Sequence, residues 1–221
     1  MTVEHFFIGA NSLRLGKKVG KGGEGEVFLI QGRPNFAVKI YYKNIRSKRK
    51  NKVHALVKSK FYENTELIAF PQEILTDASG EFVGFSMKLV SEHYPMHELY
   101  SPKSRKTHYP NVDYRFIIRA ATNVARAVAT VHEKGCVIGD FNHSGALISK
   151  KATVALIDAD SFQFTFLGAN YLCEVGMPEF TPPELQGASL RGLYRQASSD
   201  LFGLAVAIFQ LLFMGRRCFS R

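Results

Sequence analysis

The stretch "VIGDFNHSGALISKKATVALIDADSF", residues 137–162, carries acidic residues at only two places. Asp140 follows a glycine at the end of the apolar run "CVIG", and Asp158 and Asp160 flank an alanine after the run "VALI". Short apolar runs that contain β-branched residues are typical of buried strands. The pattern predicts two short strands that each end on a carboxylate.

The composition indicates a globular protein. At 221 residues, with 46% hydrophobic and 12% aromatic residues, the chain can bury a large core. Its three cysteines are widely spaced and lack metal-ligand spacing, so we expect reduced thiols and a cytoplasmic location. No signal peptide is indicated. The apolar run 201–215 is shorter than the ~20 residues of a spanning helix, so we expect a core helix and no membrane partner.

Basic residues are concentrated in one segment of a chain whose net charge is +10. Between Lys43 and Lys60 there are eight Lys or Arg residues and no acid. The segment is either an anion-binding patch, for nucleic acid or an anionic membrane, or a solvated helix face. Because no aromatic residues interleave with the charges for base stacking, we favour the solvated helix over nucleic-acid binding.

The two halves of the chain differ in their periodicity. Strand patterns at 12–20, 25–31, 36–42, 67–77 and 81–90, with a weak helix pattern at 47–60, predict a β-rich domain over residues 1–90. In 113–135, Ile117, Ala121, Val124 and Val128 recur at helical spacing before a capping Gly135. A second, apolar helix follows Asp200. We therefore predict an α+β fold with a helical domain over residues 91–221.

Two motifs in the first half suit phosphate binding. "VGKGGEGEV" places Gly20, Gly22 and Gly25 at G-x-G-x-x-G spacing between two strands, where glycines let backbone N–H groups approach phosphates. A glycine-rich hairpin turn explains the spacing equally well. Lys39 lies in the apolar strand "FAVKI", and its ammonium must reach an acceptor or extend to solvent.

With these motifs the chain resembles the eukaryotic-like protein kinase superfamily. "HEKGCVIGD" is similar to the approach to the catalytic loop, "VALIDAD" to the strand before D-F-G, and "GMPEFTPPELQG" to the end of the activation segment. "SSDLFGLAVAIFQLL" is similar to the central helix of the helical lobe. The resemblance implies a bilobal protein-kinase-like fold, with an N-lobe over 1–90 and a C-lobe over 91–221 that lacks its later helices.

The resemblance also implies roles for residues. Asp140 would be the catalytic base, Lys39 would hold the α- and β-phosphates of ATP, and Asp158 would bind Mg²⁺ or Mn²⁺. Asp200 would brace the catalytic loop, and Pro183 and Glu184 would stand in the A-P-E motif. The implied nucleotide-binding residues are Gly20, Gly22, Gly25, Val27, Ala37, Lys39, the gatekeeper Met87, Lys88 and Val90 of the hinge, and Leu147.

Several positions depart from the family pattern H-R-D-x-x-x-x-N. Gly139 replaces the Arg that usually contacts an activation-loop phosphate, which makes regulation by such a phosphate less expected. Gly145 replaces the Asn that is the usual second metal ligand, and Asn142, His143 or Asp160 are candidates to compensate. The helix expected after Lys39 contains no acid that could pair with this lysine, since residues 40–62 contain no Asp or Glu. Glu63 and Glu66 come after the helix centre.

These departures are similar to one group of bacterial kinase-like proteins, which carry helix-hairpin-helix segments or are encoded beside a phosphatase and a von Willebrand-type protein. We therefore expect a Ser/Thr protein kinase with a protein substrate, and a phosphatase or von Willebrand-type protein as a further partner. The alternatives are a nucleotide-binding pseudokinase and a small-molecule phosphotransferase. The expected autophosphorylation sites are Ser161, Thr165, Tyr171 and Thr181.

Overall fold

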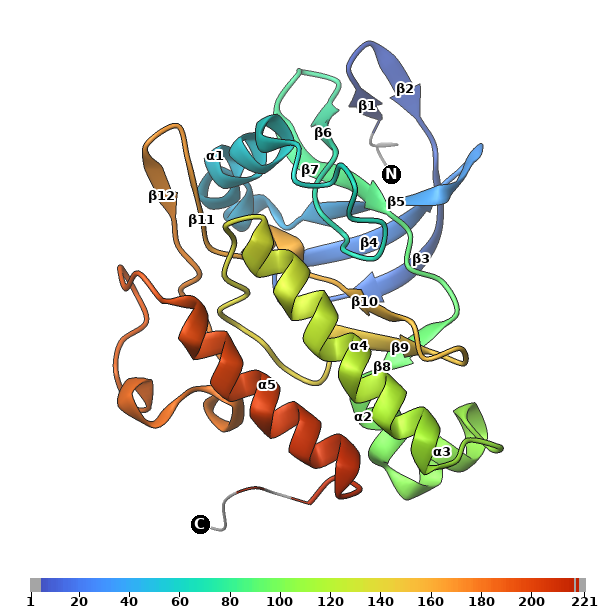
Figure 1. The fold of residues 1–221 in the computed structure, drawn as a ribbon. Coiled ribbons are helices and arrows are strands. Elements are labelled where there is room, and N and C mark those ends of the chain that lie inside the picture. Colours follow the sequence, from blue (N-terminus) through green and yellow to red (C-terminus); the bar gives the residue numbers. More distant parts are fainter. Residues whose placement is uncertain (1–4, 217, 219–221) are drawn as a thin grey trace. The chain divides into compact units, whose positions relative to one another are not determined.

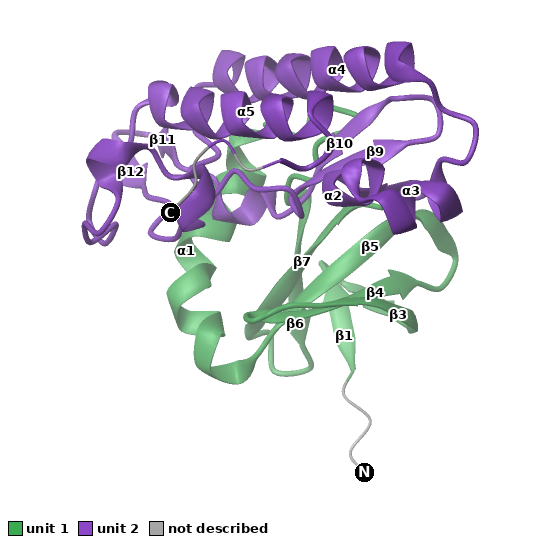
Figure 2. Cartoon of the chain, turned by 90° about the horizontal axis from the view of Figure 1, so that it is seen from below, with its two compact units in different colours: residues 1–89 green, residues 90–221 purple. Residues whose placement is uncertain are grey.

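The computed structural model describes residues 5–216 and 218, and the chain divides into two compact units, residues 1–89 and 90–221 (Figure 2). Each unit has its own secondary structure and core. In the described part of the chain, no helix is both long enough and apolar enough to cross a lipid bilayer.

Unit 1 is an antiparallel sheet with one helix (Figure 1). Its seven strands are ordered β2-β1-β6-β7-β5-β4-β3, and α1 packs on β6 and β7. The elements are β1 (Phe6–Ile8), β2 (Asn11–Leu13), β3 (Leu15–Lys21), β4 (Gly25–Ile30), β5 (Arg33–Tyr41), α1 (Lys43–Ser59), β6 (Glu73–Asp77) and β7 (Phe82–Lys88).

Helix α1 contains the basic segment. Its apolar residues Val53 and Leu56 are buried and pack toward the sheet, whereas most of its Lys and Arg side chains are at least partly exposed. The helix ends at Lys60, which adopts a left-handed conformation with φ 56° and donates its N–H to the Val57 carbonyl. The basic run is therefore a largely solvated helix face, as the sequence pattern favoured.

The structure corrects three sequence expectations in unit 1. The strand predicted over 12–20 is divided at Arg14 into β2 and β3, and β1 was not predicted. The turn between β4 and β5 lies at Gln31 and Gly32, where glycine supplies a φ of +80°, while Pro34 lies within β5. Residues 67–72 are not part of a strand, although Ile68 and its neighbours are buried.

Unit 2 is mainly helical (Figure 1). Helices α4 and α5 pack side by side, and the Asp113 carboxylate caps α4 by accepting the Phe116 N–H. The elements are β8 (His93–Pro95), α2 (Met96–Tyr100), α3 (Pro102–His108), α4 (Tyr114–Glu133), β9 (Ala146–Ser149), β10 (Val154–Leu156), β11 (Phe164–Phe166), β12 (Ala169–Tyr171) and α5 (Ala197–Leu212), with short 3-10 turns η1 (Ala159–Ser161), η2 (Pro178–Phe180) and η3 (Pro183–Leu185).

The periodicity of α4 predicted its packing correctly, since Ile117, Val124 and Val128 are all buried. The expected strand at "CVIG" is wrong. Residues 136–139 form only an isolated bridge, between Val137 and Gln163, and Asp140 follows Gly139 in a tight turn with φ +75°. Helices α2 and α3 and the β11–β12 hairpin were not predicted, because each is too short to show a clear period.

Candidate active site

Asp140 and Asp158 lie on the walls of one small cavity within unit 2. The cavity has a volume of ≈ 40 Å³ and is lined by both carboxylate residues together with Asn142, Gly145 and Ser161. The two residues are far apart in the sequence and reach the cavity from the loop after α4 and from the end of β10. The structure thus brings together the two acids that the sequence singled out, although only the second one follows a strand.

The loop that carries Asp140 is held by α5. The buried Asp200 carboxylate accepts hydrogen bonds from the backbone N–H of Ile138 at 2.7 Å and of Gly139 at 2.8 Å. Its Oδ2 also lies 2.9 Å from Nε2 of His132 on α4. A buried carboxylate with three hydrogen-bond partners is fully compensated, so it can fix the backbone just before Asp140. His132 is a member of this network that the sequence reasoning did not identify.

Burial controls the protonation of Asp140. Loss of solvation raises the pKa of its carboxyl above the ordinary value of 3.8, and the nearby Asp158 carboxylate acts in the same direction. The Asn142 side chain, the Arg195 guanidinium and the Met177 backbone N–H oppose this rise in pKa without cancelling it. A carboxylate with a raised pKa accepts a proton more readily than an ordinary aspartate, which suits a general base.

Asn142 is committed to the conformation of the loop. Its Oδ1 accepts the N–H of Ser144 at 2.9 Å and of Gly145 at 3.1 Å, and its Nδ2 donates to the Asp140 carbonyl at 2.9 Å. Its amide oxygen therefore has two donors already. The other two candidates to replace the missing ligand, His143 and Asp160, are not among the residues that line the cavity.

His143 instead packs away from the acids in a cluster of rings. Its ring lies 5.1 Å from His97 and 5.6 Å from Phe180, centroid to centroid. Burial lowers the pKa of His143, and the neighbouring His97 lowers it further while Glu179 raises it. His97 and His143 each keep a buried Nδ1 without a hydrogen-bond partner among the described residues. A neutral, packed imidazole is a structural element of the loop.

The donor set of the cavity fits a magnesium ion. Mg²⁺ is usually held by one or two carboxylates together with substrate phosphates, and Asp140 and Asp158 supply hard oxygen donors on one cavity. Asp158 has a left-handed backbone with φ 58°, a strained conformation that is frequent at functional positions. In the described part of the chain no set of three His, Cys, Asp or Glu side chains could hold a metal alone. A metal here would thus depend on ligands from the substrate.

In unit 1, strand register places the expected nucleotide-binding residues on one face of the sheet. Val27 is paired with Lys39, and Ala37 with Met87. Directly paired residues of antiparallel strands point to the same face, and so do residues two apart on one strand. Val27, Ala37, Lys39 and Met87 therefore share a face. The Lys39 ammonium lies 5.6 Å from the centroid of the Tyr41 ring.

The glycine-rich segment is a turn between β3 and β4. The Gly22 N–H donates to the Gly25 carbonyl at 2.9 Å, and Gly20 is paired with Val27. A Cβ atom at Gly25 would lie 2.2 Å from the Ile40 carbonyl oxygen, so only glycine fits at this crossing. Gly22 has no such close neighbour, which leaves its backbone accessible.

An ion pair joins this turn to helix α1. The Arg49 guanidinium donates from Nε to Glu24 Oε2 at 2.9 Å and from Nη2 to Glu24 Oε1 at 2.5 Å. The arginine side chain is only 11% exposed, so this bidentate pair is partly shielded from water. The sequence reasoning missed Glu24 and Arg49. It looked for an acid on the helix to pair with Lys39, and did not consider a base on the helix that pairs with an acid in the glycine-rich turn.

The acids that follow α1 take part in ion pairs within unit 1. Glu63 lies 3.5 Å from Lys60, and Glu66 lies 3.9 Å from Lys88. At the end of β7, the Leu89 N–H donates to the Asn35 carbonyl at 2.9 Å, which fixes the segment 88–90 that was expected to form a hinge.

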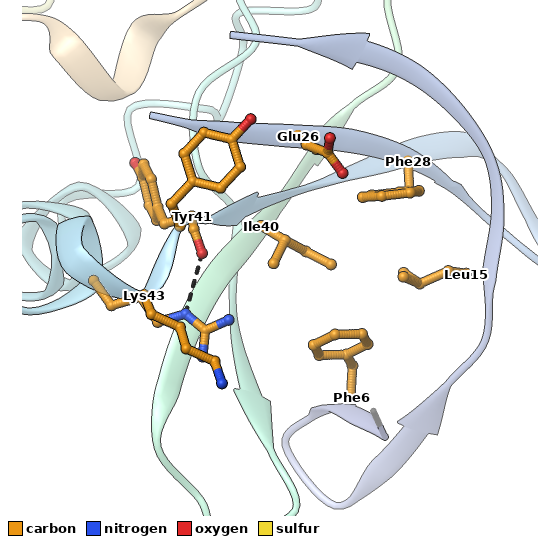
Figure 3. A pocket seen from close by; sticks show the side chains of 9 residues that line it. Phe6, Leu15, Glu26, Phe28, Ile40, Tyr41 and Lys43 are labelled. Carbon is orange, nitrogen blue, oxygen red and sulfur yellow. Dashed lines mark hydrogen bonds between the residues drawn. The ribbon is translucent and has the colours of Figure 1, made fainter. Parts of the chain in front are cut away.

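A second cavity lies on the opposite face of the sheet in unit 1. It has a volume of ≈ 450 Å³ and is lined by residues of β1, β3, β4 and β5, which are apolar or aromatic except for Glu26, and by Lys43 and Arg46 of α1 (Figure 3). Phe28 and Ile40 point into it, whereas their sequence neighbours Val27 and Lys39 point to the other face. This cavity is therefore separate from the expected nucleotide-binding residues.

The remaining expected positions lie on strands and turns of unit 2. Leu147 is on β9 and is 9% exposed. Pro183 and Glu184 form η3, and the exposed Glu184 has no ion pair with a described residue. Ser161 lines the cavity with the two acids, while Thr165 and Tyr171 lie on the β11–β12 hairpin.

Comparison with known proteins identifies this arrangement. The family model "Protein kinase domain" matches residues 13–221. The chain belongs to the protein kinase family. It is 39% identical over 208 residues to protein kinase YegI of Escherichia coli strain K12, and 40% identical over 207 residues to YegI of E. coli O157:H7. These alignments cover 93% of this chain but 32% of each relative, so the kinase domain spans about a third of their length.

A solved structure confirms the fold. The ROP18 kinase domain, in complex with AMP-PNP and sucrose, matches 97% of this kinase domain and 69% of its own chain with a TM-score of 0.68 at 14% identity. The predicted α+β, protein-kinase-like fold is therefore correct. The curled antiparallel sheet with one helix is the β-rich part of that fold, and the unit with α4 and α5 is the helical part.

Proposed function

We propose that this kinase domain transfers the γ-phosphoryl group of ATP to a Ser or Thr hydroxyl of a protein. The observation that carries the proposal is the pair Asp140 and Asp158 on one cavity of ≈ 40 Å³. Phosphoryl transfer needs groups that position the reactants and neutralise phosphate charge, and two carboxylates with a metal provide both functions.

Each residue of the site has a proposed task. Lys39 pairs with the α- and β-phosphates, and Val27 and Ala37, on the same sheet face, contact the adenine. Asp158, on the same cavity as Asp140, would hold Mg²⁺ or Mn²⁺, and the metal would neutralise charge on the phosphates. Asp140 orients the acceptor hydroxyl and takes its proton, a task that its raised pKa favours.

The direct test is incorporation of label from ATP into the domain and into a generic protein substrate, with Mg²⁺ or Mn²⁺. We expect wild-type protein and Asp113→Asn to transfer phosphate, since Asn replaces Asp well as an N-cap. We expect Asp140→Asn and Lys39→Met to lose at least about 100-fold in rate, because each removes a group required in the transition state. Phosphoamino-acid analysis of the product would establish whether Ser and Thr are the acceptors.

The main alternative is a nucleotide-binding pseudokinase, and the position that favours it is Gly145, which offers no second metal ligand. If the wild-type domain binds ATP but incorporates no more label than Asp140→Asn, the pseudokinase is the correct reading. Transfer to sugars or aminoglycosides but not to protein would instead identify a small-molecule phosphotransferase.

The setting of the reaction is also a proposal. Cys136, Cys173 and Cys218 form no disulfide among the described residues, which suits the reducing cytoplasm of a bacterium. A protein Ser/Thr kinase needs a phosphatase to reverse its action, and we propose such an enzyme, or a von Willebrand-type protein, as a partner. Co-purification with tagged full-length protein would test this.

A further inference from the structure

Arg195 is a buried cation that the proposed function gives no task. Its side chain precedes α5 and is 3% exposed. No carboxylate of the described residues forms an ion pair with it, and its Nε has no hydrogen-bond partner among them. A buried charge without an ionic partner is costly, so its other contacts must compensate for the loss of water.

Those contacts are backbone carbonyls of two separate segments. Arg195 Nη1 donates to the Gly139 carbonyl at 2.7 Å, next to Asp140 in the catalytic loop. Arg195 Nη2 donates to the carbonyls of Cys173 at 2.5 Å and Val175 at 2.7 Å. The planar guanidinium thus joins the loop of the proposed base to residues 173–175, which follow the β11–β12 hairpin.

The backbone of Arg195 is itself fixed. Its N–H donates to Gln163 Oε1 at 2.9 Å, and Gln163 Nε2 donates to the Arg195 carbonyl at 2.6 Å. Gln163 is 1% exposed, and its own backbone pairs with Val137. Both ends of the arginine are therefore anchored in the same buried network, so the guanidinium has little freedom to move.

The glycine at position 139 makes room for this arrangement. A Cβ atom there would lie 2.6 Å from Arg195 Nη2 and 2.7 Å from the Cys173 Cβ, and the φ of +75° disfavours any side chain. Position 139 is where the family pattern has the Arg that contacts an activation-loop phosphate. Arg195 occupies the adjacent space from the opposite side and contacts the segment through carbonyl groups instead.

We propose that Arg195 is a positioning residue that holds segment 173–175 against the catalytic loop, so that the segment is ordered without phosphorylation. This inference rests on the proposed kinase function, and it adds the regulation of that site. A phosphate is not needed to draw the two segments together, since three hydrogen bonds from one guanidinium already do so. The same cation lies near Asp140 and stabilises its ionised form.

The test compares Arg195→Met with the exposed control Arg191→Met in the same loop. Order of the segment is measured as the rate of cleavage after Glu174 by a glutamyl endopeptidase, with products identified by mass spectrometry. For Arg195→Met we expect cleavage to rise and kcat to fall, each by about 10-fold or more, with the KM for ATP changed by less than about threefold. Arg191→Met should match wild type in all three.

The phosphate is tested separately. Wild-type protein is treated with a phosphatase, and its loss of phosphate is verified by mass spectrometry. We expect kcat and the cleavage rate after Glu174 to stay unchanged. A large loss of activity together with faster cleavage would overturn the proposal, and so would an Arg195→Met protein that keeps both wild-type kcat and wild-type resistance.

Two further outcomes are distinguishable. If Arg195→Met does not fold, Arg195→Lys takes its place, because a lysine ammonium keeps the charge but cannot form the planar set of hydrogen bonds of a guanidinium. We expect its rate of cleavage after Glu174 to exceed that of wild type. A rate equal to that of wild type would contradict the proposal. If the wild-type domain transfers no phosphate, the proposed function fails, while the cleavage assay still decides whether Arg195 orders the segment.

Discussion

At the scale of single residues, the site combines groups that sequence patterns identify with groups that only contacts reveal. Asp140 and Asp158 could be selected because each follows an apolar run, and they line one cavity. His132, Glu24, Arg49 and Arg195 could not, since their partners are 20 or more residues away in the sequence. The role of a single charged residue cannot be predicted from the sequence until its partner is known.

Gly145 offers a direct test of the missing metal ligand. A Cβ atom at this position would have only ordinary contacts, the nearest at 3.8 Å to the Asn142 carbonyl oxygen, and its φ is not positive. Asn should therefore fit at 145 and supply an additional oxygen beside Asp158. We expect Gly145→Asn to lower the Mg²⁺ concentration for half-maximal phosphoryl transfer by about threefold or more. Gly145→Ala fits equally but adds no ligand, and an equal effect of both variants would contradict the prediction.

The half-buried Asp140 should destabilise the fold at neutral pH. Its pKa is raised on folding, so between the unfolded and folded pKa values the native state binds more protons and stability falls as pH rises. Asp140→Asn removes this cost. We expect its Tm to exceed that of wild type at pH 7, by roughly 2–4 °C for each kcal/mol relieved in a domain of this size. The difference should shrink as pH falls toward 3.8, and a constant difference would indicate another cause.

At the scale of elements, helix α5 holds the loop that carries Asp140. The Asp200 carboxylate accepts two backbone N–H groups and contacts His132, all in a buried setting. We expect Asp200→Ala to lower the free energy of unfolding by about 3 kcal/mol, because it leaves buried donors unsatisfied. Denaturant titration measures this. The exposed cap variant Asp113→Ala should cost only about 1 kcal/mol, and equal losses would refute the special role of Asp200.

The ion pair between the β3–β4 turn and α1 should order the glycine-rich segment. Arg49 binds Glu24 through two nitrogens, a geometry that lysine cannot provide. We expect Arg49→Lys and Glu24→Gln each to weaken ATP binding by about 3- to 10-fold, measured by calorimetry, because the turn becomes more mobile before binding. The double variant should be no weaker than either single one. Additive losses would mean that the two side chains act separately.

At the scale of the whole molecule, charge should influence the choice of substrate. The chain has a net charge of +10, and helix α1 carries several Lys and Arg residues and no acid. We expect kcat/KM for an acidic protein substrate to fall by about 3- to 10-fold when KCl is raised from about 50 to about 300 mM. A basic substrate of similar size should show no such fall. Equal salt effects on both substrates would point to ATP binding or to a general salt effect.

The sequence predicted the fold class because its long-period patterns are strong. Helix α4 has a regular apolar stripe, and its cap at Asp113 and Gly135 at its end are recognisable locally. The order of the motifs identified the family. The sequence did not predict β1, α2 or α3, since elements of three to seven residues contain less than two clear periods. It also misplaced a strand before Asp140, where an apolar run is buried without pairing along its length.

The space around Gly139 has a consequence for sequence variation among relatives. An arginine at position 139 and the arginine at position 195 would compete for the same volume, since even a methyl group at 139 overlaps the guanidinium. Arginines at positions 139 and 195 are therefore sterically incompatible in this backbone. Introducing arginine at 139 alone should damage the domain. If Arg195 orders the segment as we propose, a joint exchange that also shortens residue 195 should make kinase activity depend on an activating phosphate.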